Sequence, residues 1–196
     1  MGIITVDGNI GCGKTGVLNY LHKILKLPVD LEPVDNWQSH LNNMYIDKNN
    51  TFNFQVRIWL DRCWIQSTNI NNILVERSPF FIKNTFIEIA KENKLITETE
   101  YNILLDLHKK TDSMWKNNIY IYLKSNPESC LARIKKRNRM GEDNIDLEYI
   151  KRLHELHESN ILELSKIISS DKLFIINVEN KTISTIATEL YELIKK

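Results

Sequence analysis

The sequence contains few cysteines, 3 in 196 residues. Cys12, Cys63 and Cys130 form no CxxC pair, which argues against a disulfide framework or a zinc site and favours a reducing compartment. No apolar run approaches the roughly 18 residues of a membrane span, and the N-terminus has no basic start followed by an apolar stretch. We therefore expect a cytoplasmic protein with no membrane partner.

An excess of charge of either sign is also missing. Lysine and arginine total 26 against 25 aspartate and glutamate residues, so the formal net charge is +1. A chain with this balance has no global field to attract a nucleic acid or an anionic membrane. We expect no nucleic-acid partner, and any anionic ligand must be small and bound by local groups.

Nothing divides the sequence, which has no internal repeat, low-complexity tract or linker. A length of 196 residues suits one α/β domain and is short for two. We predict a single domain over residues 1–196.

Apolar runs of strand length recur along the chain, at Ile3–Val6, Pro28–Leu31, Ile73–Val75, Ile119–Leu123 and Leu173–Val178. Most of the sequence between them has helical periodicity, and the clearest helix begins near Asp146, which can serve as its N-cap. Because parallel neighbours need crossover connections, the pattern predicts an α/β fold with a five-stranded parallel sheet and helices on both faces. Ligands should bind at the carboxyl edge of this sheet.

Residues 8–15, GNIGCGKT, match the phosphate-binding loop GxxxxGK(S/T) in full and follow the first apolar run. In such a loop the glycines let backbone N–H groups face a polyphosphate, the lysine reaches the β- and γ-phosphates, and the Ser/Thr hydroxyl can hold Mg²⁺. The alternative is a glycine-rich turn that matches by chance, which the strand before and the amphipathic helix after it disfavour. We predict that ATP is bound by Gly8, Asn9, Ile10, Gly11, Cys12, Gly13, Lys14 and Thr15.

Acidic side chains follow the second and third apolar runs. Glu32 begins EPVDNW, and Glu76 and Arg77 belong to ERS, so all three should lie at the ligand-binding edge. A carboxylate there can act as a base, whereas a guanidinium cannot lose its proton. These residues alone would also fit a structural ion-pair cluster; the phosphate loop favours a functional site.

An arginine-rich stretch, RIKKRNR at 133–139, precedes MGEDN, which interrupts the helical periodicity. We predict a mobile lid at about 133–146, because arginines on a closing segment are what phosphoryl transfer requires near the transferred phosphate. A solvated helix face and a basic nucleic-acid or nuclear-localisation patch are the alternatives, and the neutral net charge weakens the second.

Together, these motifs resemble those of the deoxyribonucleoside kinases of the deoxycytidine, deoxyguanosine and insect multisubstrate type. The resemblance spans nearly the whole chain and rests on GNIGCGKT, EPVDNW, Phe54-Gln55, ERS, Phe86 ten residues after Glu76, and RIKKRNRMGED followed by LEYIKRLHELHE. It implies a P-loop kinase fold, ATP as phosphate donor, Mg²⁺, and transfer to the 5′-hydroxyl of a deoxyribonucleoside. It also implies a homodimer and a salvage role, in the host cytoplasm if the protein is viral.

The resemblance assigns roles to residues by their place in these motifs. Glu32 would be the base that accepts the 5′-hydroxyl proton, Arg77 would position that base, and Thr15 and Glu76 would support Mg²⁺. Lys14, Arg137 and Arg139 would stabilise the moving phosphoryl group, with Arg133 and Arg137 contacting ATP. The nucleoside would meet Trp37, Phe54, Gln55 and Phe86 around its base, and Tyr45 and Glu142 at the sugar 3′-hydroxyl.

Arg62 and Ile82 also match positions that face the base in this family, and here they depart from its pattern. Members that take purines or deoxycytidine pair an arginine with an aspartate there; this chain has Arg62 but Ile82 in place of the acid. A poorly paired buried arginine is costly, so Arg62 must bond the base, pair with Asp61 or turn to solvent. The preferred base stays open.

The nearest rival function is that of a nucleoside monophosphate kinase such as a thymidylate kinase. That enzyme must also bind the phosphate of its acceptor, which needs additional cations where EPVDNW offers a carboxylate. A nucleotide-binding switch is a second rival, and the sequence lacks an apolar strand that ends in a DxxG-type motif.

Overall fold

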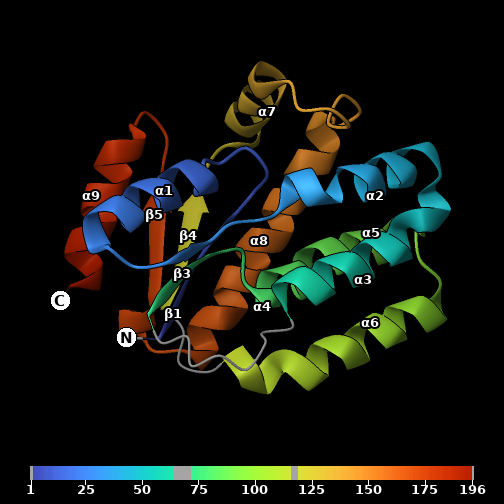
Figure 1. The fold of residues 1–196 in the computed structure, drawn as a ribbon, viewed down its shortest axis with the longest axis horizontal. Helices are drawn as coiled ribbons and strands as arrows, with labels where there is room; N and C mark the ends of the chain where they lie inside the picture. The colour runs from blue at the N-terminus through green and yellow to red at the C-terminus, as the bar shows by residue number, and fades with distance from the viewer. Residues whose placement is uncertain (1, 64–71, 116–118, 196) are drawn as a thin grey trace.

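The computed structural model describes residues 2–63, 72–115 and 119–195, and its strands form one twisted sheet (Figure 1). The strand order is β2-β3-β1-β4-β5, and every neighbouring pair is parallel. The strands are β1 (Ile3–Gly8), β2 (Val29–Asp30), β3 (Ile73–Glu76), β4 (Ile119–Lys124) and β5 (Leu173–Asn177). The predicted five-stranded parallel sheet is therefore confirmed.

Helices connect the strands. The longer ones are α1 (Lys14–Leu25), α2 (Val34–Ile46), α3 (Thr51–Arg62), α6 (Glu98–Thr111), α7 (Pro127–Arg137), α8 (Leu147–Ile167) and α9 (Ile183–Ile194). The shorter ones are η1 (Lys48–Asn50), α4 (Pro79–Phe81), η2 (Ile82–Ile87), α5 (Glu88–Glu92), η3 (Asp112–Trp115) and η4 (Ser170–Lys172). α1 packs against α9 beside the sheet, while α2, α3 and α6 form a second helical group farther from it (Figure 1).

Strand β4 shows how the helices cover both faces of the sheet. Alternate side chains of a strand point to opposite faces. Ile121 and Leu123 belong to an apolar cluster that includes Leu18 of α1 and Leu190 of α9, whereas Tyr122 packs in a separate cluster with α8. Both faces are thus covered, as an all-parallel sheet requires.

The helix predicted after Asp146 is α8. The Asp146 carboxylate accepts a hydrogen bond from the Tyr149 N–H at 2.8 Å, which confirms the N-cap. Its buried residues Ile150, Leu153 and Ile161 recur at helical spacing. No helix in the described part of the chain, α8 included, is long and apolar enough to cross a membrane.

The second strand is shorter than the predicted Pro28–Leu31, because β2 consists only of Val29 and Asp30. The backbone carbonyls at its end are occupied by a side chain. The Arg62 guanidinium, from α3, donates to the carbonyl oxygens of Asp30 at 3.4 Å and Leu31 at 3.3 Å. It also donates to the Glu76 carbonyl at the end of β3, at 2.8 Å. An arginine that is distant in sequence therefore binds carbonyls at the ends of both strands.

Candidate active site

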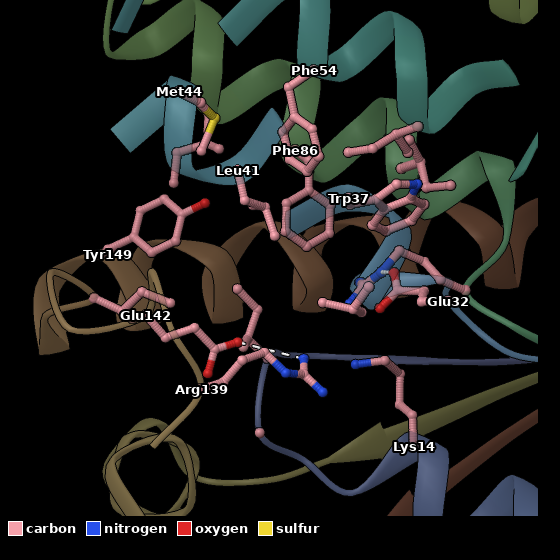
Figure 2. A pocket seen from close by; sticks show the side chains of 18 of the residues that line it. Lys14, Glu32, Trp37, Leu41, Met44, Phe54, Phe86, Arg139, Glu142 and Tyr149 are labelled. Carbon is pink, nitrogen blue, oxygen red and sulfur yellow. Dashed lines mark hydrogen bonds and ion pairs between the residues drawn. The ribbon is translucent and has the colours of Figure 1, made fainter. Parts of the chain in front are cut away.

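A cavity of about 1330 Å³ opens at the carboxyl ends of β1, β2 and β3 (Figure 2). The predicted site residues among those that line it are Ile10, Gly11, Gly13, Lys14, Thr15, Glu32, Trp37, Phe54, Gln55, Glu76, Arg77, Ile82, Phe86, Arg133, Arg137, Arg139 and Glu142. The fold thus brings together residues separated by more than half the sequence. Of the other predicted residues, the described lining does not include Gly8, Asn9, Cys12 or Arg62, and the side chain of Tyr45 lies outside what the structure describes.

The phosphate loop has the backbone that its glycines predict. Gly11 has φ of 80°, and a Cβ there would lie 2.5 Å from the Cys130 carbonyl oxygen, so only glycine fits. Asn9 anchors the loop, because its side chain donates to the Ile150 carbonyl of α8 at 2.9 Å and accepts from the Ile10 N–H at 2.8 Å. Lys14 Nζ curls back to the Asn9 carbonyl oxygen at 3.1 Å. The lysine is thus held over the loop at the cavity wall.

Glu32 and Arg77 form an ion pair at the cavity. Arg77 Nε donates to Glu32 Oε1 at 2.7 Å, and the Arg77 guanidinium lies 4.4 Å from the centre of the Phe86 ring. Burial would raise the pKa of Glu32, but the charges of Arg77 and Lys14 outweigh it and lower this pKa to about 2. Figure 2 shows the Glu32 and Lys14 side chains directed toward the same part of the cavity. Glu32 is therefore ionised at neutral pH.

Thr15 and Glu76 place two kinds of oxygen side by side. Thr15 Oγ1 donates to Glu76 Oε1 at 2.8 Å, and the Glu32 N–H donates to Glu76 Oε2 at 3.4 Å. Hydroxyl and carboxylate oxygens are ligands that suit Mg²⁺, which usually takes one or two protein ligands and completes its shell with phosphates and water. No group of three His, Cys, Asp or Glu side chains in the described ranges forms a protein-only metal site. The pair fits a Mg²⁺ ion shared with a polyphosphate.

The opposite end of the cavity is apolar and contains one buried amide. Trp37 of α2 and Phe54 of α3 meet edge to face with ring centres 6.0 Å apart, and both belong to a cluster with Ile82. Gln55 is 6% exposed, and its Oε1 has no hydrogen-bond partner among the described residues. A buried amide oxygen without a partner is unfavourable, so this one is suited to accept from a polar ligand edge.

Two residues of this apolar wall were not predicted from the sequence. Leu41 and Met44 line the cavity beside Trp37 (Figure 2). They follow Trp37 by four and seven residues along α2, so they share its face of the helix. That periodicity was the signal that could have identified them.

The segment 138–146, which follows α7, lines one side of the cavity, and its Glu142 pairs with arginines. Arg137 donates to both carboxylate oxygens of Glu142, at 2.8 Å and 2.5 Å, and Arg139 lies 3.6 Å from the same carboxylate. The Met140 carbonyl accepts a hydrogen bond from Gln38 of α2 at 3.0 Å. Glu142 therefore holds the arginines here, and the closing motion of this segment stays a prediction.

Comparison with known proteins decides the family. A family model described as deoxynucleoside kinase matches residues 4–196. The chain belongs to the deoxynucleoside kinase family. Human deoxycytidine kinase is 29% identical over 199 residues, covering 81% of this chain and 75% of that protein. Human mitochondrial thymidine kinase 2 is 31% identical over 176 residues, covering 82% of this chain and 64% of that protein.

The fold agrees with this assignment. The solved structure of deoxyadenosine kinase from M. mycoides with bound dCTP matches with a TM-score of 0.83 and 23% identity, covering 99% of this chain and 100% of that one. This deoxynucleoside kinase is thus an enzyme that phosphorylates nucleosides and has the P-loop kinase fold. The alternatives of a thymidylate-type kinase and of a nucleotide-binding switch are not supported.

The Arg62 side chain of this deoxynucleoside kinase is paired within the protein through its two terminal nitrogens, whereas its Nε has no partner in the described ranges. Its side chain is 1% exposed and forms an ion pair with Asp30 at 2.9 Å, in addition to its three carbonyl contacts. Asp61 instead pairs with Arg57 at 2.8 Å. Arg62 therefore neither pairs with Asp61 nor turns to solvent, and a bond to the base stays a prediction; sequence alone gives no sign that Asp30 lies within reach. We infer a structural role at the strand ends.

Replacing Arg62 by methionine tests that role in this deoxynucleoside kinase. The change removes the donors to three carbonyls, one of them buried and two partly buried, so we expect a loss of about 2–3 kcal/mol in the free energy of unfolding. The KM for the nucleoside should stay within about twofold of the parental value. Arg57→Met on the same helix removes a partly exposed pair and should cost less than about 1 kcal/mol. Urea unfolding and steady-state kinetics measure both; a raised KM at parental stability would contradict the assignment.

Proposed function

We propose that this kinase transfers the γ-phosphoryl group of ATP to the 5′-hydroxyl of a deoxyribonucleoside, with Mg²⁺ bound between protein and polyphosphate. The observation that carries the proposal is the ionised Glu32, paired with Arg77, on the same cavity wall as Lys14 of the phosphate loop. Phosphoryl transfer needs a base near the acceptor hydroxyl and cations near the donor phosphates. Glu32 supplies the base, and Lys14 supplies a cation.

In the proposed step, the 5′-oxygen attacks the γ-phosphorus while its proton passes to Glu32. A new P–O bond forms between the 5′-oxygen and the γ-phosphorus, the bond from the γ-phosphorus to the bridging oxygen breaks, and ADP leaves with that oxygen. Lys14 offsets charge on the transferred group, an interaction that grows in the transition state. Bound polyphosphate also counteracts the cations that lower the pKa of Glu32, so Glu32 becomes a stronger base when ATP is present.

At the other end, we propose that the apolar wall receives the nucleobase. Gln55 would pair with the base edge through its buried amide, and Phe86 and Trp37 would contact the ring faces and edges. Glu142 and Tyr45 remain our candidates for the sugar 3′-hydroxyl. In that case Glu142 must exchange its contacts with Arg137 and Arg139, which frees the arginines for the phosphates as the 138–146 segment closes.

Turnover of the purified protein tests the proposed function. With ATP and Mg²⁺, we expect phosphorylation of one or more of the four natural deoxynucleosides and no phosphorylation of deoxythymidine monophosphate. A product identified as the 5′-monophosphate supports the proposal. Turnover of the monophosphate alone, or ATP hydrolysis without any acceptor product, contradicts it. Sedimentation of the same sample tests the proposed homodimer.

Glu76→Gln tests the proposed metal site. The amide is a weaker ligand for Mg²⁺ than the carboxylate, while it retains an oxygen for the Thr15 hydroxyl. We expect half-maximal activity to need about tenfold more Mg²⁺, with little change in the melting temperature. A Mg²⁺ titration of initial rates at constant total ATP measures this. Glu88→Gln, which removes a carboxylate that accepts from Tyr101 on α6, is the control and should leave the Mg²⁺ requirement unchanged.

A further inference from the structure

Asp7 is a buried carboxylate that the proposed reaction does not use. It precedes Gly8 in β1, and its side chain is 0% exposed. Its Oδ1 accepts a hydrogen bond from the Ser78 N–H at 2.8 Å, and its Oδ2 has no partner in the described ranges. Burial raises the pKa of Asp7 to about 6, although this hydrogen bond and the charges of Arg77 and Lys14 oppose the shift. An apolar side chain would be less costly here, so packing alone does not account for Asp7.

The hydrogen bond to Asp7 holds the backbone of Ser78, the residue that directly follows the strained Arg77. Arg77 has φ of 67°, in the left-handed region that is unfavourable for a residue with a Cβ. The N–H of Arg77 donates to the Val6 carbonyl oxygen at 3.0 Å, and the next N–H, of Ser78, donates to Asp7. The strand register of β1 and β3 ends where Val6 lies opposite Glu76. Beyond that point, the acceptor of the next N–H, that of Ser78, is the Asp7 side chain and no longer a backbone carbonyl of β1.

The strained backbone determines where the Arg77 guanidinium lies. That group donates to Glu32 at 2.7 Å and to the Gly8 carbonyl oxygen at 3.3 Å, and it covers the Phe86 ring. A rotation of the Arg77 backbone toward an ordinary conformation would move all three contacts together. The Ser78 N–H is therefore a point at which β1 controls the orientation of Glu32.

We propose that Asp7 is a positioning residue: by accepting the Ser78 N–H it holds Arg77 in its left-handed conformation and thereby orients Glu32. The inference rests on the proposed role of Glu32 as the base. A residue that only stabilised the fold would change the melting temperature and leave turnover at a permissive temperature unaffected. A positioning residue changes turnover itself.

Asp7→Ala and Asp7→Asn separate these roles. Alanine removes the acceptor, whereas asparagine keeps an oxygen at the place of Oδ1. Because small displacements of reacting groups have large effects on rate, we expect Asp7→Ala to lower kcat by at least about tenfold, with the dissociation constant for ATP within about twofold. Asp7→Asn should restore kcat to within about threefold of the parent. Thr5→Val is the control: it removes the hydrogen bond that the buried Thr5 donates to the Ile119 carbonyl at 3.4 Å, from the same strand, and should leave kcat unchanged.

A double-mutant cycle with Glu32→Gln tests whether Asp7 acts through Glu32. If it does, Asp7→Ala should slow the Glu32→Gln protein by less than about threefold. Three results would each overturn the inference. They are effects of Asp7→Ala and Glu32→Gln on kcat that multiply, a parental kcat in a folded Asp7→Ala protein, and an Asp7→Asn protein as slow as Asp7→Ala. If Asp7→Ala does not fold, Asp7→Ser, whose hydroxyl is too short to accept the N–H, is measured under the same criteria. A parental rate in Glu32→Gln alone overturns the proposed function instead, so the two failures are distinguishable.

Discussion

Glu32→Gln should lower the rate of phosphoryl transfer at least about a hundredfold while leaving the fold intact. The amide keeps an oxygen that can accept from Arg77 Nε, so the geometry of the pair survives. What disappears is the site that takes the proton of the attacking hydroxyl. General base catalysis typically contributes about 10²–10⁴ in rate, which sets the expected loss.

The rate should be measured in a single turnover, because product release or lid opening limits the steady state of many enzymes and would hide part of the effect. Glu148→Gln is a matched control, since it removes an exposed carboxylate from the same cavity without touching Arg77. It should keep the parental rate. A Glu32→Gln protein that transfers phosphate as fast as the parent would remove the central element of the proposed function.

Local patterns made much of the fold predictable. The first, third, fourth and fifth strands lie within two residues of their apolar runs. For the central strands the reason is that burial on both faces demands continuous apolar sequence. The phosphate loop was predictable for a similar reason, since its backbone conformation depends on its own glycines. The short β2 was not, because the carbonyl at its end is bound by Arg62, which lies 32 residues away in sequence.

The parts of the site that sequence did not reveal depend on contacts between distant residues. The pairing of Arg62 with Asp30 and the acceptance of the Ser78 N–H by Asp7 exist only once β1, β2 and β3 lie side by side. The left-handed conformation of Arg77 is equally hidden, because a residue other than glycine gives no local sign of it. An acidic residue within an apolar strand was the available signal for both Asp7 and Asp30.

Lys14→Met should reduce phosphoryl transfer by about 10²–10³, the range found when one preorganised donor to a developing charge is removed. Lys14 is 5% exposed and is held by the carbonyl oxygens of Gly8 at 3.3 Å and Asn9 at 3.1 Å. Its ammonium group is therefore already in place before ATP binds. Such a group stabilises charge without reorganisation at the moment of reaction, which is why its loss is expected to be large.

Lys136→Met is the matched control, because it removes the same charge from an exposed position on α7 that is not part of the cavity wall. Its single-turnover rate should equal that of the parent. The loss in Lys14→Met should appear mainly in kcat, since a contact that strengthens in the transition state affects turnover more than ground-state binding. A Lys14→Met protein whose KM for ATP rises while kcat is unchanged would instead assign to Lys14 a role in binding alone.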